Sequence, residues 1–259
     1  MTDEAHARAA ALAPRAADLE RIGAQLGQLP AFADALRGKY VTVVAEVKRS
    51  SPSKGAINLG LDLAKQVTAY EAGGAAAISV LTEPTRFGGS NEDLTRARAA
   101  VRIPILKKDF HVEVVQILEA RFLGASAALV IARAVSPARL GELMAAGKDA
   151  GIEILVEVRD ERELELALTL GARLVGVNNR NLETLEIDPE TALRLLPLIP
   201  ADVIAIAESG VRTAKDVELL AAAGADAVLV GTEVSAASDP EKAVRSITGI
   251  KRTTGARKS

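Results

Sequence analysis

The stretch AGADAVLV, residues 223–230, joins the end of a helical pattern to an apolar strand pattern through a single glycine. The same order of helix, glycine and strand recurs in three further stretches, LGASAALV (123–130), AGIEILV (150–156) and LGARLVGV (170–177). Glycine commonly follows the last turn of a helix because it adopts the left-handed conformation without steric cost. The repeat therefore predicts helices that alternate with parallel strands.

Eight short runs of β-branched and aliphatic residues predict the strands, and amphipathic stretches lie between them. The runs are VTVVAEV from residue 41, AAISVL from 76, IPILKKD from 103, AALVIA from 127, IEILVEV from 152, LVGVNN from 174, DVIAIAES from 202 and DAVLVG from 226. Eight parallel strands favour a single (β/α)8 TIM barrel, of the α/β class, because closure leaves no exposed sheet edge. A doubly wound open sheet is the alternative, although no G-x-G-x-x-G motif follows the first strand.

The length of 259 residues fits either one such barrel or two modest domains. No linker rich in Pro, Gly or Ser divides the chain, so we expect residues 1–259 to form a single domain. Its expected parts are an N-terminal helical extension at 1–40, the barrel at 41–250 and a frayed tail at 251–259.

The composition argues against several classes of protein. Lys plus Arg total 32 and Asp plus Glu total 34, for a formal net charge of −2, and aromatic residues make up 2%, so we expect no nucleic-acid partner. The absence of cysteine excludes disulfides and thiolate catalysis, and His6 and His111 are the only histidines, so neither a metal nor a cofactor is expected. Residues 1–20 do not show the basic start and apolar core typical of a secretory leader, so we expect none, and no long apolar run occurs in the sequence. We expect a cytoplasmic monomer or weak homo-oligomer without a membrane partner.

Polar residues stand where the apolar strands end. Val44, Glu46 and Lys48 alternate along the first strand and therefore share one face, which we expect to point into the barrel. The same parity turns five residues of other strands inward: Lys108, Glu157, Asn178, Arg180 and Glu208. Buried charges are tolerated as pairs or as working groups, so this set predicts an active site at the C-terminal mouth. Lys107 and Asp109 have the opposite parity, and we expect them to be solvated.

Two turns follow the last two predicted strands, AESGVRTAKD (207–216) and VLVGTEVSAASD (228–239), and each places glycine and a small hydroxyl residue before a helix. Barrels of this kind often hold phosphate there, through backbone N–H groups. Either turn alone is a weak signal, since small residues also permit tight turns. The two together predict a phosphate site.

The chain resembles the indole-3-glycerol phosphate synthase family from about residue 10 to 250. Seven motifs in order carry the resemblance: AEVKRSSPSKG, SVLTEPTRFGGS, PILKKDFHV, ILVEV, LVGVNNRNLETLEID, IAESGV and VLVGTEV. The resemblance implies a barrel whose N-terminal extension helps to cover the mouth. It also implies a carboxy-lyase of tryptophan biosynthesis that needs no cofactor. That enzyme converts 1-(2-carboxyphenylamino)-1-deoxyribulose 5-phosphate into indole-3-glycerol phosphate by ring closure, decarboxylation and dehydration.

The family's catalytic roles fall on five residues. The resemblance implies that Lys108 is the general acid on the substrate ketone and that Glu157 is the base. Lys48 would position the substrate and act in dehydration, Glu46 would organise these groups, and Asn178 would hold the ring-closing region. Lys108 would be a better acid if burial and neighbouring lysine charge lowered its pKa.

The resemblance also implies the substrate contacts. Ser51 and Pro52, in the mobile loop SSPSKG, would lie near the anthranilate portion of the substrate. Phe87 and Phe110 would form apolar walls against the anthranilate ring. The ribulose chain and phosphate would contact Glu208, Ser209, Gly210, Gly231 and Thr232. Arg180 would also bind the substrate. Gly88 and Thr232 depart from the residues usual in the family, which bears on affinity rather than on the acid and base set.

Three alternatives stay open at this point. An inward lysine would also serve a Schiff-base aldolase. A barrel like phosphoribosylanthranilate isomerase would share the phosphate site, although the absence of cysteine argues against that chemistry. A non-catalytic module that binds a phosphorylated ligand would have no use for Lys108 opposite Glu157.

Overall fold

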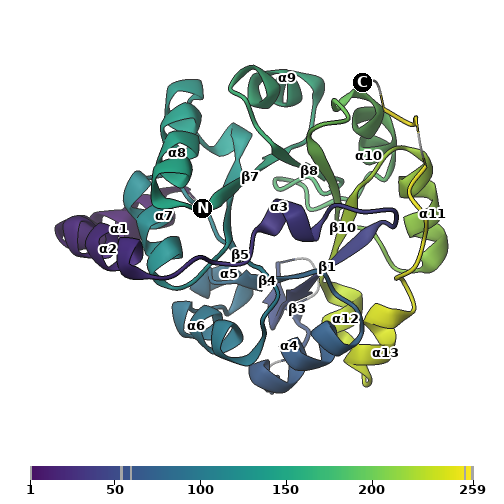
Figure 1. Cartoon of the computed structure of the whole chain (residues 1–259), viewed down its shortest axis with the longest axis horizontal. Coiled ribbons are helices and arrows are strands. Elements are labelled where there is room, and N and C mark those ends of the chain that lie inside the picture. The colour runs from purple at the N-terminus through teal and green to yellow at the C-terminus, as the bar shows by residue number, and fades with distance from the viewer. Residues whose placement is uncertain (1, 53–54, 59, 254, 258–259) are drawn as a thin grey trace.

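The computed structural model of the chain describes residues 2–52, 55–58, 60–253 and 255–257. Within them, eight parallel strands close into a barrel, which confirms the predicted fold class (Figure 1). The barrel strands are β1 (Thr42–Val47), β4 (Ala77–Leu81), β5 (Ile105–Lys108), β6 (Ala127–Ile131), β7 (Glu153–Val158), β8 (Leu174–Asn178), β9 (Ile204–Glu208) and β10 (Ala227–Val230). The ring closes where β1 pairs with both β4 and β10.

Helices surround the barrel and connect successive strands (Figure 1). The outer helices are α4 (Leu63–Ala72), α6 (Asn91–Ala100), α7 (Val114–Phe122), α8 (Pro137–Ala150), α9 (Glu161–Thr169), α10 (Glu190–Leu195), α11 (Ala214–Ala222) and α13 (Pro240–Arg245). Short helices α5 (Pro84–Phe87) and α12 (Thr232–Ala236) follow β4 and β10, and β2 (Ser50–Ser51) pairs with β3 (Gly55–Ala56). The 3-10 helices are Ala13–Arg15, Ala132–Ala134 and Leu196–Leu198. None of the helices that the described residues form is long and apolar enough to cross a membrane.

The N-terminal segment contacts both ends of the barrel through α1 (Thr2–Leu12), α2 (Ala16–Gln25) and α3 (Phe32–Ala35). At the N-terminal end of β7, Glu153 accepts the N–H of Ala33 at 3.0 Å, and Phe32 is fully buried in the interior core. At the opposite end, Arg8 Nη2 lies 2.6 Å from Asp109 Oδ1, just beyond β5. The segment therefore closes the bottom of the barrel and braces a loop at its mouth.

Side chains inside the barrel follow the predicted alternation. Alternate strands supply four aliphatic residues of the interior core, Val44, Leu106, Leu155 and Ile206. Two positions further along each of these strands lies a charged residue, namely Glu46, Lys108, Glu157 and Glu208. Since alternate strands of such barrels contribute the four side chains of one layer, a whole layer at the mouth is charged.

Lys107 and Asp109 point away from the axis, as their parity predicts, but the expectation that they are solvated is wrong. Their exposed fractions are 2% and 7%. Lys107 Nζ lies 3.2 Å from a Glu119 oxygen on α7, and Asp109 accepts bonds from Arg8 and from Thr82 at 2.6 Å each. Helices α1 and α7 cover this side of β5, so Lys107 and Asp109 form ion pairs instead of being hydrated.

The described residues of the C-terminal tail also differ from the expected frayed segment. Ile250 accepts the N–H of Val41 at 2.8 Å, and the N–H of Arg252 is bonded to Lys39 at 3.0 Å. Arg257 Nη2 contacts both oxygens of the fully buried Asp226, at 2.8 and 2.7 Å. Asp226 stands at the N-terminal end of β10, and a carboxylate buried there needs cations, which the tail supplies. Residues 254, 258 and 259 lie outside the described part of the tail.

Candidate active site

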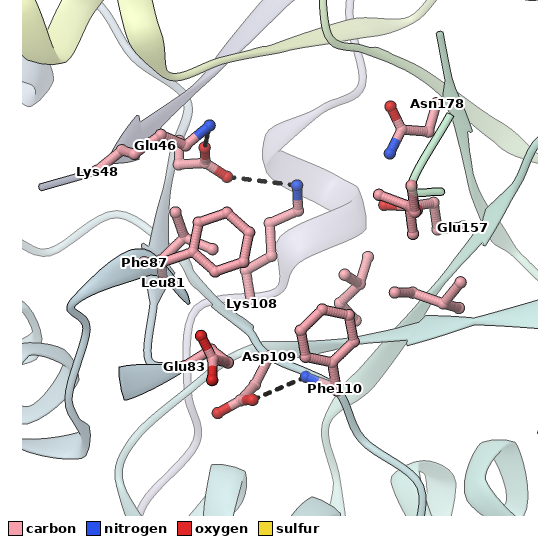
Figure 2. Close-up of a pocket in the computed structure, with 13 residues that line it drawn as sticks. Glu46, Lys48, Leu81, Glu83, Phe87, Lys108, Asp109, Phe110, Glu157 and Asn178 are labelled. Carbon is pink, nitrogen blue, oxygen red and sulfur yellow. Dashed lines mark hydrogen bonds and ion pairs between the residues drawn. The ribbon is translucent and has the colours of Figure 1, made fainter. Parts of the chain in front are cut away.

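Two adjoining cavities open at the C-terminal ends of the strands. The smaller, of about 60 Å³, is the one drawn in Figure 2. The larger, of about 590 Å³, extends towards the turns after β9 and β10. Glu46, Lys48 and Lys108 line both cavities. A ligand that spans the two cavities would therefore lie over these three charges.

Glu46 holds both lysines of the site. Its Oε1 lies 2.7 Å from Lys48 Nζ, and its Oε2 lies 3.4 Å from Lys108 Nζ. Lys108 Nζ also lies 3.1 Å from Glu208 Oε2, so it bridges carboxylates of β1 and β9. Figure 2 shows the Lys108 amine between Glu46 on one side and the pair Glu157 and Asn178 on the other.

The carboxylates set the protonation state of Lys108. Burial alone would lower the pKa of Lys108, but Glu46, Glu208 and Glu157 outweigh burial and hold the pKa above its ordinary value. The lowered pKa that would make Lys108 a better acid is therefore not found, because the charges nearest to Lys108 are carboxylates and not a lysine. Burial would likewise raise the pKa of Glu46, yet Lys108 and Lys48 hold it at about 2. Both groups are charged at neutral pH.

Glu157 is the carboxyl group of the site that titrates near neutrality. Burial, followed by the negative charge of Glu208, raises the pKa of Glu157 to about 7, against the opposing effects of Lys108 and of a hydrogen bond to Asn178. Asn178 Oδ1 accepts the N–H of Arg180 at 2.9 Å, which orients the amide. A group with such a pKa is suited to take up and return a proton.

Glu208 lies deeper than the sequence suggested. It is fully buried and borders neither cavity, although it was expected to contact the ribulose chain and phosphate. Within the described part of the chain, neither carboxylate oxygen of Glu208 has a hydrogen-bond partner, and Lys108 is its ion-pair partner. Gly176 on β8 makes the room, since a Cβ there would lie 2.1 Å from Glu208 Oε1. The inward parity of Gly176 was visible in the sequence, but its contact with Glu208 was not.

The smaller cavity has apolar walls. Phe87 and Phe110 line it together with four aliphatic residues that the sequence analysis did not name, Leu81, Leu129, Ile131 and Leu182. Aliphatic residues carry no pattern that separates a pocket wall from a core position.

Carboxylates hold the backbone beside each aromatic wall. Glu83 accepts the N–H groups of Thr85 and Arg86, at 3.1 and 2.6 Å, and so caps the helix that ends at Phe87. Asp109 accepts the N–H of Phe110 at 2.8 Å (Figure 2). Sequence reasoning missed Glu83, whose signal was an acidic residue directly before a proline, a common start of a helix.

The predicted phosphate turns line the larger cavity. Ser209, Gly210, Gly231 and Thr232 all border it, and so does Arg180. Ser209 has φ of 66° and Gly210 has φ of 93°. Few serines adopt this left-handed conformation, and backbone strain of this kind gathers at binding and catalytic sites.

The loop after β1 contributes less than expected. Ser51 is buried in the small hairpin and Pro52 is exposed, and neither borders the two cavities. Ser53 and Lys54, in the middle of the SSPSKG segment, lie outside the described residues. Gly88, one of the two departures, has φ of 63° and ends α5.

The site combines an ammonium that stays protonated, a carboxyl group that titrates near pH 7, apolar walls at one end and two small-residue turns at the other. The described residues contain no group of three or more His, Asp or Glu side chains that could hold a metal ion. The arrangement is suited to acid–base chemistry on a ligand with a flat apolar ring and an anionic tail.

Comparisons with known proteins give one family. A profile described as "Indole-3-glycerol phosphate synthase" matches residues 3–247. A protein of that name from a Parafrankia strain is 51% identical over 209 residues, which cover 81% of this chain and 78% of the relative. "Indole-3-glycerol phosphate synthase 1" of Streptomyces coelicolor is 51% identical over 210 residues, with 81% and 78% covered. Among solved structures, a thiamine phosphate pyrophosphorylase from Pyrococcus furiosus has a TM-score of 0.60 at 15% identity, covering 80% of this chain and 93% of that one, and shows the shared fold.

Proposed function

The chain belongs to the indole-3-glycerol phosphate synthase family, and from that premise we propose how its own residues carry the reaction. The substrate is 1-(2-carboxyphenylamino)-1-deoxyribulose 5-phosphate, and the product is indole-3-glycerol phosphate. One observation carries the proposal: Lys108 is held between Glu46 and Glu208 where the apolar cavity and the phosphate turns meet.

The shape of the site supports one orientation of the substrate. The carboxyphenyl ring would lie in the smaller cavity, which Phe87 and Phe110 line, and the phosphate would lie at the turns formed by Ser209–Gly210 and Gly231–Thr232, which line the larger cavity. The ketone then lies near Lys108, the charge that both cavities share. Apolar walls favour a flat ring, and backbone N–H groups at small-residue turns favour an anion.

Lys108 acts first. The ring carbon that bears the carboxylate attacks the ketone carbon, and Lys108 gives its proton to the ketone oxygen as the carbon–carbon bond forms. The raised pKa makes Lys108 a weak acid, but the alkoxide that develops on the ketone oxygen is a strong base, so the proton moves only as the carbon–carbon bond forms. An ammonium held by two carboxylates is also a fixed donor, and it binds the oxygen more strongly as negative charge develops there. The bond to the carboxylate then breaks, carbon dioxide leaves, and the electron pair restores the aromatic ring.

Dehydration completes the reaction. The new hydroxyl group leaves as water with a proton from Lys48, and Glu157 removes a proton from the neighbouring carbon, which gives the indole double bond. With a pKa of about 7, Glu157 is ionised in a large fraction of molecules at neutral pH, so it can act as this base. Glu157 then returns its proton to one of the two lysines, and water supplies the other proton, which is the one that the loss of carbon dioxide consumes.

The rival aldolase mechanism requires a neutral lysine to attack a carbonyl. Glu46, Glu208 and Glu157 raise the pKa of Lys108, which opposes that step. Because the proposed mechanism forms no covalent bond between the substrate and a lysine, we expect borohydride, added during turnover, to leave no substrate mass on Lys108 or Lys48.

The direct test mixes purified protein with the carboxyphenylamino-deoxyribulose phosphate and follows indole fluorescence, with the product identified by mass spectrometry. We expect one carbon dioxide for each indole-3-glycerol phosphate formed. Unchanged substrate, or a reduced imine on either lysine, would contradict the proposal.

A cytoplasmic location and a monomer or weak homo-oligomer, with the phosphorylated substrate as its small-molecule partner, are part of the same proposal. The phosphorylated substrate supports an intracellular setting. Cell fractionation and sedimentation of the purified protein would test both points.

A further inference from the structure

A buried polar cluster lies behind β1, on the side away from the cavities. Gln66 and Tyr70 come from α4, and Ser235 comes from α12. Their exposed fractions are 7%, 0% and 0%. None of the three takes part in the mechanism above, and buried polar groups are costly unless each is satisfied, so the cluster calls for an explanation.

Ser235 bonds the backbone on both sides of the end of β1. The N–H of Lys48 donates to Ser235 Oγ at 3.1 Å, and Ser235 Oγ donates to the carbonyl of Glu46 at 2.9 Å. The pairing of β1 with β4 ends at Val47, so the N–H of Lys48 lies beyond that ladder. One hydroxyl group thus fixes the backbone of both Glu46 and Lys48.

Tyr70 fixes the hydroxyl in turn. Its phenol oxygen lies 3.2 Å from Ser235 Oγ and 3.3 Å from the Glu46 carbonyl, and it accepts a bond from Gln66 Nε2 at 2.9 Å. Burial raises the pKa of Tyr70 to about 12, so the phenol stays a neutral donor. If Tyr70 donates to Ser235, the serine oxygen makes the three bonds that a hydroxyl group allows.

The cluster also joins the catalytic lysine to the proposed phosphate turn. The N–H of Ser235 donates to the Gly231 carbonyl at 2.9 Å, and Ser235 follows Thr232 by one turn of α12. Gly231 in turn packs against the ion pair, since a Cβ there would lie 2.4 Å from Glu46 Oε1 and 3.2 Å from Lys48 Nζ. The phosphate turn, Ser235 and Lys48 form one bonded chain.

We propose that Ser235 is a positioning residue for Lys48 and that Tyr70 orients its hydroxyl. The inference rests on the proposed function, because that function gives Lys48 its role in dehydration. Without the hydroxyl, the Lys48 N–H and the Glu46 carbonyl each lose a buried partner, and the end of β1 is free to move. Small displacements of a catalytic group reduce turnover more than they reduce binding.

The test compares kcat and KM for Ser235→Ala, Ser235→Thr and Ser235→Val, at a temperature where each variant is folded by circular dichroism. We expect kcat of Ser235→Ala to fall about tenfold or more, with KM within about threefold of the parent. Thr and Val have nearly the same shape, so we expect the Thr variant to turn over about tenfold faster than the Val variant. Kcat within about twofold of the parent for folded Ser235→Ala, or equal kcat for folded Thr and Val variants, would overturn the proposal.

Tyr70→Phe is the second arm, and we expect a fall in kcat of about threefold because Ser235 keeps its two backbone bonds. Tyr40→Phe is its matched control: Tyr40 is the chain's other tyrosine, is 37% exposed and precedes β1 at the opposite end of the barrel. Equal kcat for the two tyrosine variants would remove the assigned role of Tyr70.

The parent is measured first, so failure of the proposed function appears as no indole product from the parent. Failure of this inference instead appears as an active parent with an equally active serine variant.

Discussion

The two ends of the barrel both bury carboxylates, but they treat them in opposite ways. At the N-terminal end, Asp226 accepts the N–H of Ala205 at 2.7 Å and contacts Arg257 and Arg252. At the C-terminal end, Glu46 and Glu208 share two lysines, and Glu157 has a pKa of about 7. Among the described residues, neither oxygen of Glu208 has a hydrogen-bond partner. A fully satisfied charge contributes to the fold, whereas an incompletely satisfied one is free to interact with a substrate.

Replacing Lys108 by Met should have the largest effect on turnover. The acid acts in the transition state, so we expect kcat to fall by at least about 10²-fold while substrate still binds at the phosphate turns. Lys65→Met is the matched control, because the Lys65 side chain on α4 is 86% exposed. Stopped assays of the indole product give kcat for both variants and test this prediction. A Lys108 variant that retains a tenth of the parent's kcat would remove its role as the acid.

The pH dependence of turnover tests whether Glu157 is the base that titrates near pH 7. Because a base must be ionised and Glu157 acts after carbon dioxide has left, we expect kcat of the parent to fall about tenfold for each pH unit below about 7. Glu157→Gln should be much less active and should lose that slope. A parent profile that is flat from about pH 5.5 to 8 would contradict the assignment.

Stability should show the same titration with the opposite sign. The pKa of Glu157 is raised in the folded state from 4.5 to about 7, so its contribution to stability is present below 4.5 and is lost as the pH rises through 7. The Tm of Glu157→Gln should therefore exceed the Tm of the parent by more at high pH than at low pH. An equal difference at both would mean that burial does not perturb this carboxyl group.

Asp226→Asn should have the smallest effect on turnover and a large effect on stability. Breaking a buried ion pair costs about 3–5 kcal/mol, so we expect a clear fall in Tm with kcat within about twofold of the parent. Asp202→Asn is the control, since Asp202 pairs with Arg173 on the surface and such pairs contribute little. Thermal unfolding and the indole assay on the same samples separate the two ends. A stable Asp226 variant with poor turnover would break the contrast between them.

Much of the fold and of the charged layer could be predicted from the alternation of side chains along each strand. A period of two residues decides which side chains point inward, so the layer of Glu46, Lys108, Glu157 and Glu208 could be read from eight apolar runs. The eight strands and their parallel order followed from the helix, glycine and strand repeat.

Contacts between distant segments could not be read in this way. Parity places Lys107 outside the barrel but does not say that α7 will bring Glu119 to within 3.2 Å of it. The sequence places Arg257 in a basic tail but does not show Asp226, 31 residues earlier, as its partner. The pKa of Lys108 depends on which charges lie within a few ångströms, and that is set by the packing of four strands.

Gly176 has a consequence for evolution and for design. An inner layer of a barrel has no spare volume, so the deep carboxylate of Glu208 exists only because the neighbouring strand leaves a gap the size of a side chain. Any residue that filled position 176 would push that carboxylate away from Lys108. We therefore expect the two positions to be inherited together, and a designer who wants a buried acid in a barrel must first remove a side chain from the strand beside it.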